Sequence, residues 1–241
     1  MNTEINRRAG SLVAVAIVAA VVAGCASEPA ASAGPDASGA VPNPTVALED
    51  QIGDAILAGD ETLVEALLDA GLDPSVDLGA GVAPLHRAAA ADQVEIVAIL
   101  VDAGANVDAR AGNGQTPLMI AAGSAGSDTV DALLDDGADP LISNPKLEGM
   151  TALHYAAWRG RADTLAALLD FGVDIDLVDG RETTALMYTT FLGNPESADL
   201  LIARGCDLNH RDDDGVTALF WARYHEFPDI AQAIEDAGGV E

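Results

Sequence analysis

One seven-residue phrase recurs along the chain at a nearly constant interval. It starts at Ala83, Thr116, Thr151, Thr184 and Thr217, where it reads APLHRAA, TPLMIAA, TALHYAA, TALMYTT and TALFWAR. Successive starts are separated by 33, 35, 33 and 33 residues. This self-similarity predicts a solenoid, because a short repeat cannot bury its apolar face alone and must cover it with its neighbours.

A second marker keeps the same register as the phrase. A glycine lies 21 residues after each start, and four of these glycines open a G-x-[DN] pattern, at Gly104, Gly137, Gly172 and Gly205. The same pattern at Gly71-Leu72-Asp73 places an earlier, degenerate unit near Asp50. We therefore predict six units over residues 48–239. They start near Asp50, Ala83, Thr116, Thr151, Thr184 and Thr217.

The phrase and its period resemble those of the ankyrin repeat, in which T-P-L-H-x-A recurs every 33 residues. The resemblance implies an all-α fold: an ankyrin-repeat helical solenoid of about six helix-turn-helix units joined by β-turn fingers. The residues themselves agree with this. Thr151 is suited to cap the start of a helix and Gly172 to end one. Leu165, Leu168 and Leu169 form an apolar stripe between them.

Both ends of the repeat array depart from the pattern. The first unit lacks the phrase, and the last carries polar Gln232, Glu235 and Asp236 in its second half. Terminal repeats need one solvated face, so both departures predict caps. The 35-residue interval places two extra residues in the loop 143–149, where we expect a longer finger.

The N-terminus has the pattern of a secretion signal. Arg7 and Arg8 precede an apolar stretch at residues 11–23 that is too short to span a bilayer as a mature helix. The sequence Val22-Ala23-Gly24-Cys25 then resembles the lipobox of bacterial lipoproteins, a family in which the signal is cut before a lipid-carrying cysteine. We therefore expect a lipoprotein signal peptide at residues 1–24 and a lipid on Cys25. The alternatives are an ordinary signal peptide and an uncleaved membrane helix.

The residues after Cys25 predict a flexible tether. They are mostly Ala, Ser, Gly and Pro, a composition that cannot bury enough apolar surface to order itself. We assign residues 25–47 to the lipidated cysteine and linker, and residues 48–241 to the ankyrin repeat domain. The predicted location is the extracytoplasmic face of the bacterial cell membrane, with the chain held there by its lipid anchor.

The chain is strongly acidic, with a formal net charge of −28. This charge argues against binding to nucleic acid and against adhesion to anionic lipid. It favours a basic partner, although solubility alone also explains it. Cys206, the second cysteine, lies in a G-x-D turn where neighbouring units have Ala or Val, so we expect a small buried thiol.

The resemblance also implies where a partner binds. In ankyrin repeats the fifth, eighth and ninth residues of each unit face the concave groove. All three Tyr and both Trp of the chain fall on the fifth and eighth positions of the last three units. A contiguous aromatic patch is rarely left exposed without a use. The predicted protein-binding residues are Tyr155, Trp158, Arg159, Tyr188, Phe191, Leu192, Trp221, Tyr224 and His225.

One alternative and one observation stand against this interpretation of the groove. The rings could instead pack on each other and on the fingers as a second core, an alternative favoured if they prove almost completely buried. In addition, six basic residues fall on the groove or the fingers: Arg87, Arg110, Lys146, Arg159, Arg181 and Arg211. A partner that carries a carboxylate could pair with Arg159, which opposes the simple inference from net charge.

Catalytic and metal-binding chemistry finds little support in the sequence. The histidine of the phrase, His86 and His154, is structural in the family, and the acidic run 212–214 lacks the spacing of a calcium loop. We expect no metal, no cofactor and no enzymatic activity. The predicted function is a membrane-tethered protein-binding module for an unknown envelope or secreted protein. The alternatives are an immunity or inhibitor protein that blocks an enzyme delivered into the envelope, and small-ligand binding in the groove.

Overall fold

The computed structural model describes residues 44–241. The predicted signal peptide, Cys25 and most of the predicted linker lie outside the described residues. The first described helix, α2, begins at Pro44, so residues 44–47, which we assigned to the linker, are helical. The same helix runs through Asp50, so the first unit does not begin with a helix cap at its predicted start.

Residues 44–241 contain twelve helices and no strand, as the resemblance implied. The helices are α2 (Pro44–Ala58), α3 (Glu61–Asp69), α4 (Pro84–Ala90), α5 (Val94–Asp102), α6 (Pro117–Ser124), α7 (Ser127–Asp135), α8 (Ala152–Arg159), α9 (Ala162–Phe171), α10 (Ala185–Leu192), α11 (Pro195–Ala203), α12 (Ala218–Tyr224) and α13 (Pro228–Asp236).

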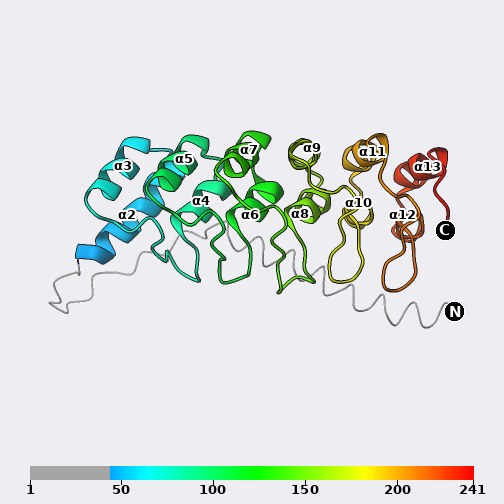
Figure 1. Cartoon of the computed structure of the whole chain (residues 1–241), viewed down its shortest axis with the longest axis horizontal. Helices are drawn as coiled ribbons and strands as arrows, with labels where there is room; N and C mark the ends of the chain where they lie inside the picture. Colours follow the sequence, from blue (N-terminus) through cyan, green and yellow to red (C-terminus); the bar gives the residue numbers. More distant parts are fainter. Residues whose placement is uncertain (1–43) are drawn as a thin grey trace. The chain divides into compact units, whose positions relative to one another are not determined.

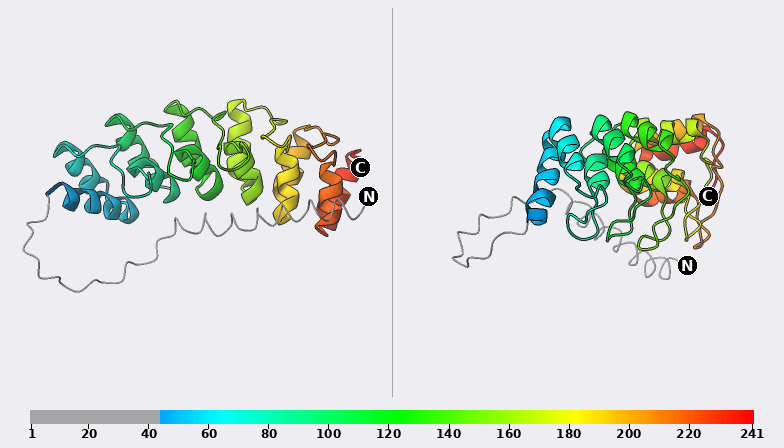
Figure 2. Two further views of the ribbon diagram at one scale, coloured as in Figure 1. Left: turned by 90° about the horizontal axis from the view of Figure 1, so that it is seen from below. Right: turned by 60° about the vertical axis from the view of Figure 1, so that its left-hand side comes forward.

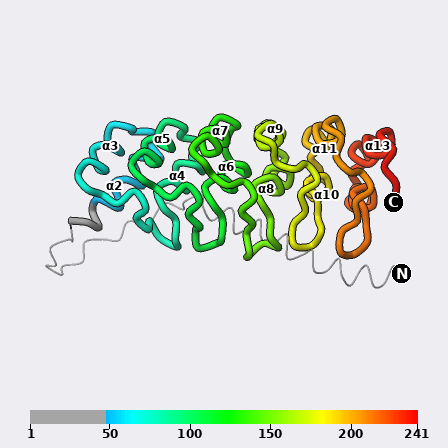
Figure 3. Tube along the Cα trace, in the orientation of Figure 1, coloured from blue at the N-terminus to red at the C-terminus, as the bar shows by residue number. Residues whose placement is uncertain are grey.

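The helices form two layers in a row of six pairs (Figure 1). The first helix of each pair contacts the first helix of the next, and these even-numbered helices make the inner layer. The second helices contact one another in the same way and make the outer layer. The loops that join the pairs project together beyond the inner layer, as the tube trace in Figure 3 shows most clearly. The turned views in Figure 2 show the pairs following one another in chain order.

The leucine of the phrase holds the two layers together. Leu85, Leu118, Leu153, Leu186 and Leu219 occupy the same position in five successive units and are at most 2% exposed. Burying a side chain of this size contributes roughly 1.5–3 kcal/mol. The leucine that recurs in each phrase of the sequence therefore recurs at the same interval in the buried core.

The threonine that opens the phrase caps the inner helices. Thr116, Thr184 and Thr217 each accept, through Oγ1, a hydrogen bond from the backbone N–H three residues later, at 3.3 to 3.4 Å. One of the four unpaired N–H groups at each helix start is satisfied in this way. The phrase thus marks a helix start for a physical reason.

The histidine of the phrase joins a helix start to the next finger. The Nδ1 atoms of His86 and His154 accept the backbone N–H of Ala83 and Thr151, both at 3.1 Å. Their Nε2 atoms lie 3.0 Å from the carbonyl oxygens of Ala109 and Leu177 and donate to them. Burial lowers the pKa of both imidazoles below the ordinary value of 6.5. Both rings are therefore neutral structural links.

This arrangement predicts how one histidine responds to acid. Because the pKa of His154 is lowered on folding, the unfolded chain takes up a proton first as the pH falls below 6.5. The stability that neutral His154 provides is present above that pH and is lost below it. In His154→Met, which copies Met119 and Met187 of neighbouring units, we expect the unfolding free energy to fall less between pH 7 and pH 5 than in the wild type. Urea unfolding at both pH values measures this difference, and parallel profiles would contradict it.

The G-x-[DN] pattern closes the turn after each outer helix. The Asp or Asn side chain accepts the backbone N–H two residues later, at 2.8 to 3.1 Å, in all five units that carry the pattern. Cys206 lies in the last of these turns and is buried, as expected. Burial, with the nearby charge of Asp176, raises the pKa of its thiol to about 12. The thiol is therefore inert at neutral pH.

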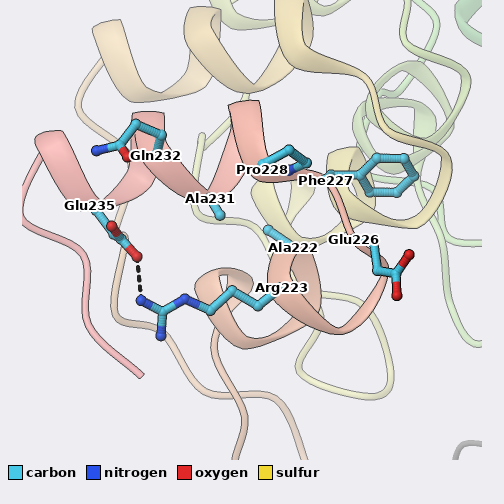
Figure 4. Close-up of a pocket in the computed structure, with 8 residues that line it drawn as sticks. All are labelled: Ala222, Arg223, Glu226, Phe227, Pro228, Ala231, Gln232 and Glu235. Carbon is cyan, nitrogen blue, oxygen red and sulfur yellow. Dashed lines mark hydrogen bonds and ion pairs between the residues drawn. The ribbon is translucent and has the colours of Figure 1, made fainter.

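The C-terminal unit ends in a polar face. Gln232, Glu235 and Asp236 are exposed there, which agrees with the predicted cap. Arg223 stands where earlier units have buried Ala or Thr, and its guanidinium pairs with Glu235 and Glu241. A cavity of about 460 Å³ lies on this face, and Figure 4 shows the residues around it. It is lined by Ala222, Arg223, Glu226, Phe227, Pro228, Ala231, Gln232 and Glu235.

Candidate binding groove

The inner helices α8, α10 and α12 carry eight of the nine predicted binding residues, and His225 follows directly at the end of α12, but four of the rings are not exposed. Tyr155, Trp158, Tyr188 and Trp221 are only 2 to 7% exposed. The expectation of an open aromatic patch is therefore wrong for these four. They form the second core that we considered as the alternative.

Hydrogen bonds to the fingers explain why three of these rings are buried. The Tyr155 hydroxyl accepts from Asn144 Nδ2 at 2.9 Å, and the Tyr188 hydroxyl donates to Asp179 Oδ2 at 2.6 Å. Trp221 Nε1 donates to Asp212 Oδ2 at 2.8 Å. Each ring buries its apolar body while its polar tip finds a partner in the finger that precedes its helix. The fifth-position aromatics therefore brace the fingers.

The same carboxylates also close the finger turns. Asp179 Oδ1 accepts the backbone N–H groups of Arg181 and Thr183, at 2.8 and 3.0 Å. Asp212 Oδ1 does the same for Asp214 and Val216, both at 3.1 Å. Burial, together with the charge of Asp179, raises the pKa of Tyr188 well above its ordinary value, so its hydroxyl remains a donor at neutral pH.

The rings also contact each other across neighbouring units. Tyr188 meets Phe191 edge-on at 5.3 Å between centroids, and Phe191 meets Trp221 at 5.8 Å. Trp221 in turn meets Tyr224 at 5.8 Å. Pairs in this geometry add roughly 0.5–1.5 kcal/mol each beyond burial. The rings thus connect α10 to α12 as an apolar chain.

The remaining five predicted residues keep access to solvent. Leu192 is 54% exposed and Tyr224 43%, Arg159 is exposed, and Phe191 and His225 are half-buried. They occupy the eighth and ninth positions of the last three units. We call these five residues, Arg159, Phe191, Leu192, Tyr224 and His225, the groove surface.

Apart from α2, which contains Glu49, Asp50 and Asp54, the helices of the two layers differ sharply in charge. None of the inner helices α4, α6, α8, α10 and α12 contains Asp or Glu, and three of them carry an arginine: Arg87, Arg159 and Arg223. Each of the outer helices α3 to α13 contains two or three carboxylates and no Lys or Arg. The groove side is therefore much less acidic than the net charge suggests.

Most basic residues of the fingers are engaged within the fold. Arg110 and Arg211 donate to finger carbonyl oxygens, and so does Lys146. Arg181 pairs with Asp213 at 3.5 Å and with Asp214 at 3.3 Å. Of the six basic residues that sequence analysis placed here, Arg159 is the one that lies on the groove surface.

The described residues offer no evident site for a metal. No group of three or more His, Cys, Asp and Glu side chains within residues 44–241 is arranged to hold an ion. The acidic run 212–214 is occupied by its contacts with Trp221 and Arg181.

None of the described helices is long and apolar enough to cross a bilayer.

Sequence and structure comparisons point to one family. The family model described as ankyrin repeats (3 copies) matches residues 52–144, 112–179 and 153–239. The ankyrin repeat domain of Bcl-3, a unique member of the IkappaB protein family, is 26% identical over 78% of this chain and 86% of that chain, with a TM-score of 0.69. The human ASB11 ankyrin repeat domain is 22% identical over 78% of this chain and 84% of that chain, with a TM-score of 0.70. A search of curated proteins finds no significant match.

Proposed function

The chain belongs to the ankyrin repeat family, whose repeats are generally protein–protein interaction modules, and we propose that it binds its partner through the groove surface of the last three units. The observation that carries this proposal is the exposure of Arg159, Leu192 and Tyr224 at the ends of three successive inner helices. Aromatic side chains and arginine are enriched among residues that dominate binding energy. The buried rings beneath this surface support it by holding the fingers and helices in a fixed arrangement, which lowers the entropy cost of binding.

We also propose that the module acts outside the cytoplasm while tethered to a membrane. The support is the sequence alone: the basic and apolar N-terminus, the lipobox-like Val22–Cys25 and the linker that follows. A tether concentrates the module near membrane partners, so a modest affinity suffices. The wild type is expected to incorporate labelled fatty acid, and Cys25→Ser to incorporate none and to migrate as the longer chain with its signal uncut, as immunoprecipitation and gels would show. A wild type that takes up no label, or equal labelling of both proteins, would contradict a lipid on Cys25.

The binding surface is tested by capture with matched variants. The bait is the chain from residue 26 onward, which retains the compact unit at residues 42–241. We expect the bait to retain a specific envelope or secreted protein, and Leu192→Ser/Tyr224→Ser to weaken that binding by about 10-fold or more, because two apolar contacts are lost. The measurement is an affinity titration with the retained protein.

The control is Leu141→Ser/Phe171→Ser. Leu141 and Phe171 are 58% and 53% exposed, so they match the groove pair in exposure, but they lie on a finger loop and at the end of α9. This control should bind as the wild type does. Equal binding by both double variants would contradict the proposed surface.

A further inference from the structure

We propose that the partner segment that occupies the groove carries a carboxylate that pairs with Arg159, and apolar side chains that cover Leu192 and Tyr224. This inference rests on the proposed function and gives the partner a stated chemistry. It differs from the prediction that net charge alone makes, which is a basic partner.

Arg159 is positioned in advance for such a contact. Its Nε donates to the Gly123 carbonyl oxygen at 3.3 Å, and its guanidinium lies 5.9 Å from the centre of the Trp158 ring. No partner within residues 44–241 engages its two terminal nitrogens. A guanidinium held on an aromatic face keeps its remaining N–H groups in a plane that suits bidentate binding of a carboxylate.

The inner helices of the groove leave Arg159 without a competing carboxylate. The five inner helices that form the groove floor contain no Asp or Glu. On the fingers, Asp179 is hydrogen-bonded to Tyr188 and Asp212 to Trp221, so these side chains are held by the fold, although they keep their negative charge. Exposed Glu148 and Glu182 on the fingers oppose the attraction. The pairing therefore depends on direct contact with Arg159 rather than on attraction at long range.

The repeat register sets the spacing of the partner's side chains. Arg159 and Leu192 occupy the ninth positions of successive units, and Tyr224 follows in the next. Packed helices lie about 8–10 Å apart. A helical partner rises 1.5 Å per residue, so one unit corresponds to about five to seven of its residues. An extended partner rises about 3.3 Å per residue, so one unit corresponds to about three.

Salt dependence distinguishes this partner from a basic one. The whole chain is repelled by an acidic partner at long range, because its net charge is −28. Salt screens that repulsion while the direct contact with Arg159 is weakened less. The association rate with an acidic peptide should therefore rise as salt is added. If the chain were instead an inhibitor of a basic enzyme, its partner would be basic. Association with such a partner should become slower as salt is added.

Selection from a displayed library of random peptides tests the inference. The immobilised baits are the chain from residue 26 onward, its Arg159→Glu variant and its Arg204→Glu variant. Arg204 pairs with Asp170 at 2.6 Å at the end of the outer helix α11, so Arg204→Glu makes the same change in net charge away from the groove. Thermal melting of each bait reports whether it is folded.

We expect the wild type and Arg204→Glu to enrich peptides with Asp or Glu at the stated spacing from apolar residues. Arg159→Glu should enrich Lys or Arg at that place and should bind the acidic peptides at least about 10-fold more weakly. Enriched apolar peptides without a charge preference, or unchanged acidic peptides on Arg159→Glu, would overturn the inference and leave the proposed function standing. If no peptide is enriched on the wild type, the inference and the proposed groove surface both fail.

Discussion

Replacing Trp221 by alanine is expected to lower the free energy of unfolding by about 3–5 kcal/mol, the range measured for buried Trp and Phe in other proteins. Trp221 is 5% exposed, donates to Asp212 and contacts the rings of Phe191 and Tyr224. Removing it leaves a cavity between α10 and α12 and an Asp212 carboxylate that loses one of its donors. Urea unfolding followed by circular dichroism measures the effect.

Tyr224→Ala is the matched control for Trp221→Ala. Tyr224 lies on the same helix, three residues further on, and keeps much of its ring in solvent. Its replacement should cost about 1–2 kcal/mol, because it loses ring contacts but opens no closed cavity. Equal losses in the two variants would mean that Trp221 is not the internal brace described above. Trp221→Ala is also unsuitable as a test of binding, since reduced binding would report loss of the fold.

Replacing Gly193 by alanine is expected to cost about 2–4 kcal/mol. Gly193 ends α10 with φ of 69°, a left-handed conformation that costs an L residue roughly 1–2 kcal/mol. A Cβ at this position would also overlap the ring of Phe227, which begins the last outer helix. Moving this half-buried ring aside adds about 1–2 kcal/mol, the lower part of the range for an overpacked contact.

Gly205→Ala separates the two causes of this loss. Gly205 has a similar φ of 82°, but a Cβ there would meet no atom within 4 Å. The Gly205→Ala variant should lose about 1–2 kcal/mol of unfolding free energy, which is the cost of the left-handed backbone alone. Thermal melting and urea unfolding of both variants give the comparison. If the two variants lose the same unfolding free energy, the close approach of Gly193 and Phe227 does not contribute to packing of the last unit on its neighbour.

The period of the sequence was enough to predict the fold because each marker has a local cause. The opening threonine caps a helix, the leucine fills the space between layers, and the G-x-[DN] pattern ends a helix and closes a turn. These roles depend on a few neighbouring residues, so a single sequence reveals them. The first unit was less predictable, because it lacks the phrase and α2 starts six residues before the predicted unit start at Asp50.

The exposure of the groove residues could not be predicted in the same way. Trp158 and Tyr224 both occupy the eighth position of their units, yet Trp158 is 3% exposed and Tyr224 is 43% exposed. Trp158 is followed by two further units, whereas Tyr224 lies in the last unit, so the difference depends on what the next unit places over the ring. Those are contacts between residues of different elements, and residue type at a repeat position does not determine them.

One signal in the sequence could have revealed the braces. Asp179 and Asp212 each lie five residues before the start of a unit whose fifth residue is Tyr or Trp. That pairing of a carboxylate with an aromatic donor, repeated at one spacing, predicts a hydrogen bond from ring to finger. Asn144 lies seven residues before its start, because the finger at 143–149 carries the two extra residues. The insertion hides the third example.

Tryptophan fluorescence tests most directly the claim that the rings of the last three units form an internal brace. The chain has two tryptophans, Trp158 and Trp221, and both are buried, so their emission reports on these positions alone. Acrylamide is a suitable quencher because it is neutral and is not repelled by the net charge of −28. If the rings form this brace, the emission is blue-shifted and quenching is several-fold weaker than in the same chain unfolded in urea. Emission and quenching equal to those of the unfolded chain, at a pH and temperature where circular dichroism shows intact helices, would contradict it.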